Sequence, residues 1–424
     1  MIDIGLIRDD PERFRDAAAA KHFQVDIDRL LEVDKALLEA KRNLQDISTE
    51  KNRIGKSIPR LGPEEKEAAL LQLSDLKQRE ASFDQEIKDL GPEFDRLMQE
   101  VAQPADEDVP LGKDDTENVE IRKEGRIREF EFEPKDHVQL GLGLDILDIE
   151  RGVKLAGTRN YFLKREGAML HWAVLRFALD FMVSRGYVAM SVPLLMKDEA
   201  MQGTGYYPGS EDQTYRMEKD ELNLAGTAEV PLTAFRMGEI LREDDLPLKS
   251  VALSTCFRRE AGAAGKDTYG LYRIHQFDKV EQVVVCKNSE QESNGFHEEI
   301  LANAEGVMRA LELPYRVVNV CTGDLGRGQA KKFDIEAWMP SRGGYCETHS
   351  ASKFYDFQAR RMNLRYKDSA TKKNVFCHTL NNTVIASPRI LIPLLELYQN
   401  ADGSVTVPEA LRSYLGGRER IVRR

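Results

Sequence analysis

Cysteine is scarce in this chain of 424 residues, and the cysteines that occur form no recognisable pattern. They are far apart, odd in number and without a Cys-x-x-Cys pair: Cys256, Cys286, Cys321, Cys346 and Cys377. This spacing excludes a disulfide framework and a cysteine-based zinc site, and it is typical of reduced thiols. The chain also lacks a run of 18 apolar residues and a signal-peptide layout in residues 1–10. We therefore expect a cytoplasmic protein without a membrane segment.

An excess of positive charge is absent as well. The formal net charge is -11, and charged residues make up 31% of the chain. This excludes a uniformly basic nucleic-acid binder, although a local basic face is sufficient to contact phosphates. The length allows two or three domains, each with its own core.

Two apolar heptad stripes lie between residues 26 and 101. The first consists of Leu30, Val33, Leu37, Ala40, Leu44, Ile47, Lys51, Ile54 and Ile58. The second consists of Ala69, Leu73, Leu76, Glu80, Phe83, Ile87, Leu90, Phe94, Leu97 and Val101. A Pro- and Gly-containing turn, 58–63, separates them, which predicts two antiparallel helices in a coiled-coil hairpin. About 30 residues per helix give an arm roughly 45 Å long. Each stripe has one polar position, Lys51 or Glu80.

The sequence suggests boundaries for the rest of the chain. We expect a helical-hairpin domain at 1–101, a kink or break at Gly91-Pro92, and an acidic, proline-containing linker at 102–118. A larger domain should then occupy 119–417, followed by a frayed basic tail at 418–424. By itself the hairpin is compatible with dimerisation, a spacer role or RNA binding. Its first helix is the more basic one, with Lys41, Arg42, Lys51, Arg53 and Lys56 as candidate phosphate contacts.

The segment 254–285 predicts a β-hairpin with a charged and aromatic surface. Strands at 254–260 and 272–285 flank a glycine-bearing turn, and alternation places Arg258 and Glu260 on one face. The return strand presents Arg273, His275, Phe277 and Glu281. Guanidinium groups match phosphate oxygens, a phenyl ring stacks on a base, and a carboxylate accepts from an exocyclic amine. A solvated hairpin with surface ion pairs is equally compatible with this segment taken alone.

Other motifs favour the nucleotide interpretation. Phe257-Arg258-Arg259-Glu260 and Arg389 resemble the second and third signature motifs of the class II aminoacyl-tRNA synthetases. The closer resemblance is to the seryl-tRNA synthetase family, and it spans the chain to Gly417. It is carried by Thr227–Leu232 (TAEVPL), Cys256–Gly262 (CFRREAG), His275–Glu281 (HQFDKVE), Cys321–Gly326 (CTGDLG), Asp356–Arg361 (DFQARR) and His378–Asn381 (HTLN).

This resemblance implies an α+β protein in which the helical hairpin precedes a class II catalytic domain, an antiparallel sheet flanked by helices. The activity implied is ATP-dependent activation of L-serine and transfer of the seryl group to tRNA(Ser), gripped by the N-terminal arm. Service to the selenocysteine tRNA, tRNA(Sec), stays open. Helix 167–185 and a strand leading to Pro193 resemble the first signature motif, which implies a homodimer.

The resemblance also implies roles for individual residues. Arg258 would hold the α-phosphate of ATP and the serine carboxylate, Arg389 the γ-phosphate and Arg273 the outer end of the triphosphate. Phe277 would stack under adenine, Glu260 would read its amine, and Glu347 and Ser350 would bind Mg²⁺. Serine recognition would involve Thr227, Glu229, Glu281, Asn381 and Thr383.

Several positions depart from the common bacterial pattern. Glu347-Thr348-His349-Ser350 stands where many members have Glu-Ile-Ser-Ser, and Asn382 stands where many have Gly. We expect Asn382 to alter the backbone or narrow the pocket, and Pro393 to remove a hydrogen bond and kink the helix after Arg389. His349 and His275 are interpreted as structural residues rather than substrate ligands.

Two alternative functions remain at this stage. An amino acid:carrier-protein ligase would activate an amino acid without tRNA, but such relatives lack the arm. A non-catalytic tRNA-binding paralogue would not need Arg258, Glu260, Glu347 and Arg389, all of which are present.

Overall fold

The computed structural model describes residues 1–262, 265 and 267–423. The chain divides into two compact units, Met1–Ala102 and Gln103–Arg424, and each is described by itself. The first is helical and the second is built around a large sheet, as the α+β prediction requires.

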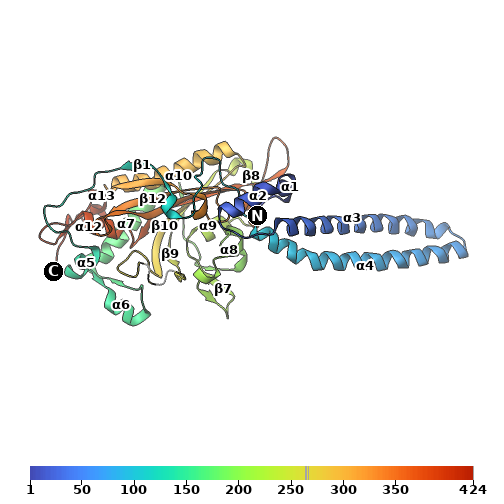
Figure 1. Cartoon of the computed structure of the whole chain (residues 1–424), viewed down its shortest axis with the longest axis horizontal. Coiled ribbons are helices and arrows are strands. Elements are labelled where there is room, and N and C mark those ends of the chain that lie inside the picture. The colour runs from blue at the N-terminus through green and yellow to red at the C-terminus, as the bar shows by residue number, and fades with distance from the viewer. Residues whose placement is uncertain (263–264, 266, 424) are drawn as a thin grey trace. The chain divides into compact units, whose positions relative to one another are not determined.

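The first unit contains the predicted helical hairpin. Two short helices, α1 (Ile4–Asp9) and α2 (Pro11–Ala20), precede α3 (Ile27–Ser57) and α4 (Pro63–Glu100), which run side by side (Figure 1). A turn of 3-10 helix at Ile58–Arg60 joins the two long helices. Helix α4 continues through Gly91-Pro92, so the predicted break is wrong.

The two polar heptad positions pair with each other across the hairpin. Lys51 Nζ lies 2.5 Å from Glu80 Oε2, and Arg29 Nε donates to Glu93 Oε1 at 2.8 Å nearer the base. These ion pairs fix the register between helices whose remaining contacts are apolar and less directional. The polar interruptions of the stripes are therefore matched partners.

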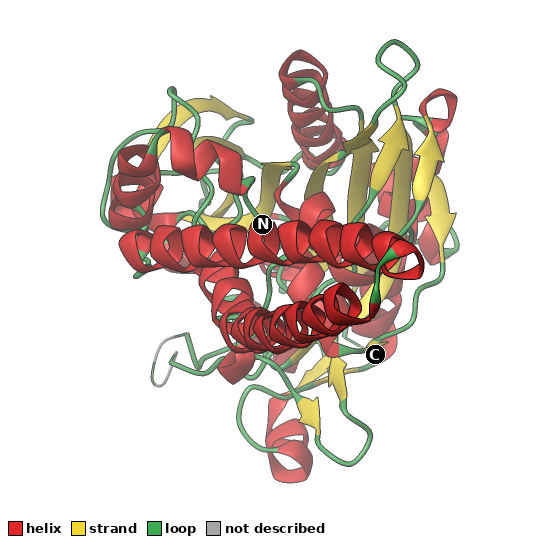
Figure 2. Ribbon diagram, turned by 90° about the vertical axis from the view of Figure 1, so that its right-hand side faces the viewer, coloured by secondary structure: helices red, strands yellow, loops and turns green. Residues whose placement is uncertain are grey.

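An eight-stranded sheet forms the centre of the second unit (Figure 2). Its order is β1 (Val119–Glu124), β11 (Tyr315–Asn319), β12 (Lys331–Met339), β13 (Gly344–Tyr355), β16 (His378–Ser387), β10 (Gln276–Cys286), β9 (Leu248–Phe257) and β4 (Val188–Met190). All neighbours are antiparallel except β4 and β9. The valine-rich β10 lies between β9 and β16, as befits a strand buried on both faces.

Two long helices cover one face of this sheet. Helices α7 (Arg165–Ser184) and α10 (Glu290–Ala310) share an apolar core with β10, β12 and β16. Leu170 and Val174 of α7 are buried there, and α7 is followed by Gly186 at φ +83°. The other face meets α9 (Glu229–Ala234) through Leu232, Val283 and Val285.

Shorter elements surround the sheet. The helices are α5 (His137–Gly143), α6 (Ile149–Ala156), α8 (Asp198–Thr204), α11 (Phe357–Met362), α12 (Leu391–Leu397) and α13 (Glu409–Arg412). The short strands are β2 (Leu147–Asp148), β3 (Phe162–Leu163), β5 (Leu195–Met196), β6 (Arg216–Met217), β7 (Leu222–Leu224), β8 (Ile240–Arg242), β14 (Arg365–Lys367), β15 (Asn374–Phe376), β17 (Val405–Thr406) and β18 (Arg420–Ile421). Among the described residues, no helix has the length and hydropathy needed to cross a membrane.

The expected linker and tail are both fastened to the second unit. Gln103 and Asp106 donate backbone hydrogen bonds to Arg327 and Ala330, and Lys353 Nζ lies 2.5 Å from Asp106 Oδ2. At the other end, β18 pairs with β17 and Ile421 is fully buried. Charge composition suggested loose segments, whereas buried apolar and ionic contacts hold them.

Candidate active site

A cavity of about 250 Å³ opens on the α9 face of the sheet. It is lined by eleven of the twelve predicted site residues: Thr227, Glu229, Arg258, Glu260, Phe277, Glu281, Glu347, Ser350, Asn381, Thr383 and Arg389. The twelfth, Arg273, lines an adjoining pocket that shares Arg258, Glu260, Glu347 and Arg389 with the first. The structure therefore brings together residues that are spread over 163 positions of the chain, from 227 to 389.

Strands β10, β13 and β16, the start of α9 and the segments that follow β9 and β16 position these side chains. Alternation along β10 turns Phe277 and Glu281 into the cavity, while β16 and β13 contribute the residues opposite them. Arg258 and Glu260 lie just beyond the end of β9, not within it as predicted, and Glu260 has φ +52°. The Arg258 N–H donates to His275 O at 2.9 Å, so the hairpin pairing is extended by one residue pair past the strand.

Two arginines form one end of the cavity. The Arg258 guanidinium lies 5.2 Å from the Phe277 ring centroid, and its Nε donates to Gly226 O at 3.3 Å. Arg389 donates from Nε to Tyr272 O and from Nη1 to Glu347 O, both at 3.1 Å, and its guanidinium stacks on Tyr272. Backbone carbonyls and aromatic faces hold both arginines without neutralising them.

Carboxylates at this end sit among positive charges. Glu260 accepts a hydrogen bond from Arg273 at 2.7 Å. Burial would raise the pKa of Glu347, but the charges of Arg389, Lys332, Arg258 and Arg273 outweigh it and hold the pKa below its ordinary value. Glu347 is therefore an ionised oxygen donor at neutral pH.

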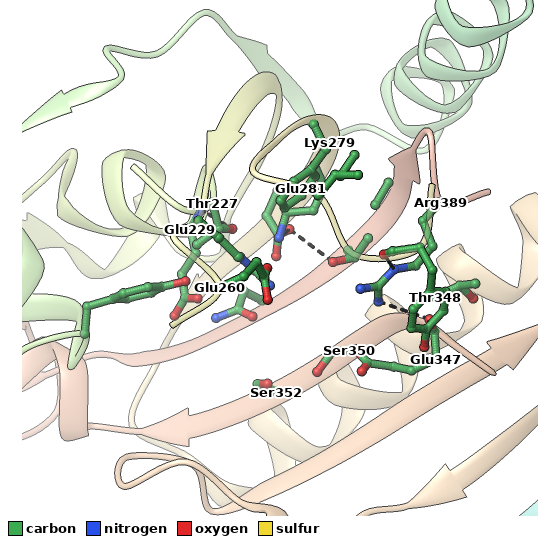
Figure 3. Close-up of a pocket in the computed structure, with 18 of the residues that line it drawn as sticks. Thr227, Glu229, Glu260, Lys279, Glu281, Glu347, Thr348, Ser350, Ser352 and Arg389 are labelled. Carbon is green, nitrogen blue, oxygen red and sulfur yellow. Dashed lines mark hydrogen bonds and ion pairs between the residues drawn. The ribbon is translucent and has the colours of Figure 1, made fainter. Parts of the chain in front are cut away.

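The other end of the cavity carries two carboxylates, Glu229 and Glu281 (Figure 3). Glu281 is 2% exposed, lies 2.5 Å from Lys279 Nζ, and accepts from the Thr383 hydroxyl at 3.3 Å. Glu229 accepts from Gln358 Nε2 at 2.8 Å. Burial and the nearby Glu281 charge raise the pKa of Glu229 to about 7, even though the Gln358 bond opposes the shift.

Several lining residues were not singled out from the sequence, among them Tyr206, Tyr272, Lys279, Gln329 and Ser352. Lys279 had a usable signal, because it lies between Phe277 and Glu281 with the same alternation. Tyr206 and Gln329 come from irregular segments, and no periodic pattern points to them.

The departures from the family pattern have structural explanations. His349 is buried, bonded to Thr348 Oγ1 and Val384 O, and burial lowers its pKa to about 4, so it is a structural residue. Asn382 donates to Ile300 O beneath α10 and does not line the cavity, which corrects the expectation of a narrowed pocket. Pro393 is the third residue of α12, where the N–H has no helical partner, so no hydrogen bond is lost.

This fold and cavity define a class of enzyme. An antiparallel sheet carrying an arginine beyond one strand and another before a helix is the arrangement of the class II aminoacyl-tRNA synthetases. In agreement, the family model "tRNA synthetase class II core domain (G, H, P, S and T)" matches residues 213–398.

The particular family follows from full-length matches. The model "Seryl-tRNA synthetase N-terminal domain" matches residues 1–103. A serine--tRNA ligase from Deinococcus radiodurans is 44% identical over 419 residues, covering 99% of this chain and 98% of the relative. The chain belongs to the seryl-tRNA synthetase family, and it is an ATP-dependent ligase. Because the relative is matched through the arm as well, neither alternative function is supported.

Solved structures agree with this assignment. The crystal structure of seryl-tRNA synthetase from Pyrococcus horikoshii complexed with ATP superposes with a TM-score of 0.94 at 36% identity, covering 100% of both chains. A cytoplasmic serine-tRNA ligase from Naegleria fowleri in complex with AMP has a TM-score of 0.88 at 30% identity, covering 100% of this chain and 99% of that one.

Proposed function

We propose that this cavity joins L-serine to ATP and then transfers the seryl group to the 3′-terminal ribose of tRNA(Ser). The serine carboxylate attacks the α-phosphorus of ATP, giving seryl-adenylate and pyrophosphate. The observation that carries the proposal is the polarity of the cavity, with arginines at one end and buried hydroxyl- and ammonium-binding groups at the other. Two anions must meet in this reaction, so alignment and charge neutralisation supply most of the catalysis.

The arginine end would bind ATP. Arg258 would hold both the α-phosphate and the attacking carboxylate, and Arg389 and Arg273 would extend the positive surface toward the outer phosphates. Phe277 and Glu260 would take the adenine ring and its amine. The planar guanidinium group suits phosphate oxygens. The guanidinium groups of Arg258 and Arg389 would need little reorganisation on binding, because each Nε already donates to a backbone carbonyl and Arg258 also lies over the Phe277 ring.

The acidic end would bind serine. Glu229 and Glu281 face the same space and would share the ammonium group, while Thr383, Thr227 and Asn381 would meet the hydroxyl and carboxylate. Within the described part of the chain, Asn381 Nδ2 is buried without a hydrogen-bond partner, which leaves a donor for the substrate. A polar pocket of this kind rejects alanine because its groups would stay unpaired.

Serine binding should depend on pH through Glu229. Its carboxyl group is protonated below a pKa of about 7, and only the ionised form attracts an ammonium group. We expect the Kd for serine to fall about tenfold as pH rises from roughly 6 to 8. Isothermal titration calorimetry at fixed ionic strength measures this, and Glu229→Gln should bind weakly with no pH dependence over that range. A flat profile for the unaltered protein would contradict the assignment.

The residues at the arginine end fit Mg²⁺. Glu347 supplies an ionised carboxylate and Ser350 a hydroxyl, both hard oxygen donors that leave room for phosphates and water. Asp334 faces Ser350 across strands β12 and β13, and its Oδ1 is buried without a partner among the described residues. When bound, the ion would neutralise phosphate charge. Glu347 and Ser350 would hold it.

Removing the Glu347 carboxylate should raise the Mg²⁺ requirement. We expect Glu347→Gln to increase the Mg²⁺ concentration for half-maximal ATP–pyrophosphate exchange by about tenfold, since an ionised ligand is replaced by a neutral one. Glu336→Gln, on the neighbouring strand and bonded to Arg316, serves as the control with an unchanged requirement. Equal requirements in both variants would rule out Glu347 as a ligand.

The helical arm would bind tRNA, and the exposed face of α7 would contact a second subunit. Lys41, Arg42 and Lys56 of α3 are exposed for contact with tRNA phosphates, whereas Lys51 is engaged by Glu80. Trp172 on α7 is 61% exposed and Val188 on β4 is 63% exposed, which suits a homodimer interface built by this helix and strand.

Residence in the cytoplasm is consistent with the five cysteines being free thiols.

Aminoacylation of total tRNA tests the whole proposal. Purified protein supplied with ATP, Mg²⁺ and each labelled amino acid in turn should charge serine alone, and sequencing the charged RNA shows whether tRNA(Sec) accompanies tRNA(Ser). Preferential charging with glycine, alanine or threonine would overturn the substrate assignment.

A further inference from the structure

A row of polar side chains crosses three strands beneath helix α7. Thr255 on β9, Asp278 on β10 and Ser387 at the end of β16 are direct cross-strand neighbours, and His171 of α7 lies over them. Beneath α7 this face of the sheet carries apolar side chains such as Val280 and Val284, which belong to the core. Polar groups in such a place must be fully bonded to be tolerated.

The row is bonded without interruption. His171 Nε2 lies 2.9 Å from Asp278 Oδ2, and His171 Nδ1 lies 2.8 Å from Ser387 Oγ. The Thr255 hydroxyl donates to Asp278 Oδ1 at 2.6 Å. Because the ionised Asp278 carboxylate can only accept, Nε2 carries the imidazole proton and donates it to Asp278, and Nδ1 accepts from the Ser387 hydroxyl. These bonds hold the pKa of Asp278 below its ordinary value against the effect of burial.

A serine, a histidine and an aspartate in contact have the composition of a hydrolytic triad, but this set cannot act as one. Ser387 is 0% exposed and His171 is 6% exposed, so no substrate reaches the hydroxyl. The set is an internal connection between a helix and the sheet.

Both sheet residues of this connection adjoin the ATP end of the cavity. Asp278 follows Phe277, whose side chain turns to the opposite face, and Ser387 precedes Arg389 by two residues. On the cavity side, Arg389 is held by the carbonyls of Tyr272 and Glu347. We propose that His171 is a positioning residue for ATP, which acts through Ser387 on Arg389 and through Asp278 on Phe277.

The physical basis of this proposal is that a site which aligns charged groups tolerates only small displacements of those groups. Guanidinium and phosphate must meet at hydrogen-bonding distance, and small displacements weaken both bonds of a fork together. Helix α7 is anchored to the core by Leu170 and Val174, so His171 offers a rigid reference on the side of the sheet away from the ligand. This inference rests on the proposed ATP-binding role of Arg389.

Ser387→Ala is the direct test, because it removes one hydroxyl and no apolar contact. The KM for ATP in serine-dependent exchange should rise about tenfold, while the KM for serine stays within about twofold. His171→Gln, whose amide nitrogen reaches toward Asp278 but not Ser387, should give the same rise. The double variant should match either single variant, since all three lose the same bond.

The chain contains a matched control at the other end of β16. Ser293 of α10 and His378 form a second buried serine–histidine bond of 2.5 Å, and His378 is the first residue of β16 whereas Ser387 is the last. Ser293→Ala should lower the melting temperature by a similar amount to Ser387→Ala but leave the KM for ATP unchanged. A purely structural role for His171 predicts the same result for both variants, and that outcome would overturn the proposal.

The variant Arg389→Ala distinguishes the positioning role proposed for His171 from the ATP-binding role proposed for Arg389. If Arg389→Ala raises the KM for ATP at least about a hundredfold and Ser387→Ala leaves it unchanged, only the positioning role of His171 fails. If Arg389→Ala leaves the KM for ATP unchanged, the assignment of Arg389 fails first. Should Ser387→Ala not fold, the ATP dependence of His171→Gln decides the matter in the same way.

Discussion

Arg258→Ala should lower serine-dependent ATP–pyrophosphate exchange by at least about a thousandfold, the scale of loss seen when a preorganised charge at a transferring phosphoryl group is removed. Arg258 lies over Phe277 and is tied to Gly226, so its charge faces the point where carboxylate and α-phosphate would meet. Without it, two anions approach each other unscreened. The measurement is kcat/KM for exchange, together with the melting temperature.

The neighbouring arginine provides the control. Arg259 is exposed, and its backbone N–H donates to Gln213 O, so Arg259→Ala should keep activity within about twofold. Arg258→Lys should recover only part of the loss, because an ammonium group cannot form the planar fork. Full activity in Arg258→Ala would show that the neutralising charge lies elsewhere.

Glu281→Gln should lower kcat/KM for serine by roughly a hundredfold or more while leaving the KM for ATP within about threefold. Glu281 is almost fully buried, pairs with Lys279 and accepts from Thr383. The amide keeps the shape but removes the charge that would hold the serine ammonium, and it leaves Lys279 without its counter-ion. Exchange kinetics with serine and ATP varied separately measure the two constants.

The ion pair between Glu336 and Arg316 provides a control, because it shows what the loss of an ion pair alone does to stability and to the two KM values. Glu336→Gln breaks a contact with Arg316 outside the cavity and should cost stability without altering either KM. An increase in the KM for ATP equal to that for serine in Glu281→Gln would contradict the division of the cavity into two ends.

Heptad periodicity predicted the two long helices of the arm well. A heptad stripe reports directly which helix face is buried, and even the two polar exceptions, Lys51 and Glu80, turned out to be partners. Charge composition was a poorer guide to structure than periodicity. The charge of the acidic segment 102–118 and of the basic tail suggested a linker and a frayed end. In the structure, Asp106 forms an ion pair with the buried Lys353, and Ile421 belongs to a strand that pairs with β17.

Strand alternation assigned the hairpin residues Arg258, Glu260, Phe277 and Glu281 to one surface. The other site residues were predicted from the family resemblance: Thr227, Glu229, Glu347, Ser350, Asn381, Thr383 and Arg389. Arg258 and Glu260 were placed correctly at the cavity although the strand ends before them, since the hairpin pairing continues through His275. Tyr206 and Gln329 could not be found, because residues in irregular segments reach the cavity only through tertiary folding. The same holds for the His171–Ser387 contact, which joins positions 216 residues apart.

The most direct test of this account is a crystal structure of the protein with serine and a non-hydrolysable ATP analogue. In this complex the guanidinium groups of Arg258 and Arg389 should lie within hydrogen-bonding distance of phosphate oxygens, and the serine ammonium should lie against Glu229 and Glu281. A complex in which both guanidinium groups turn away from the polyphosphate would contradict it.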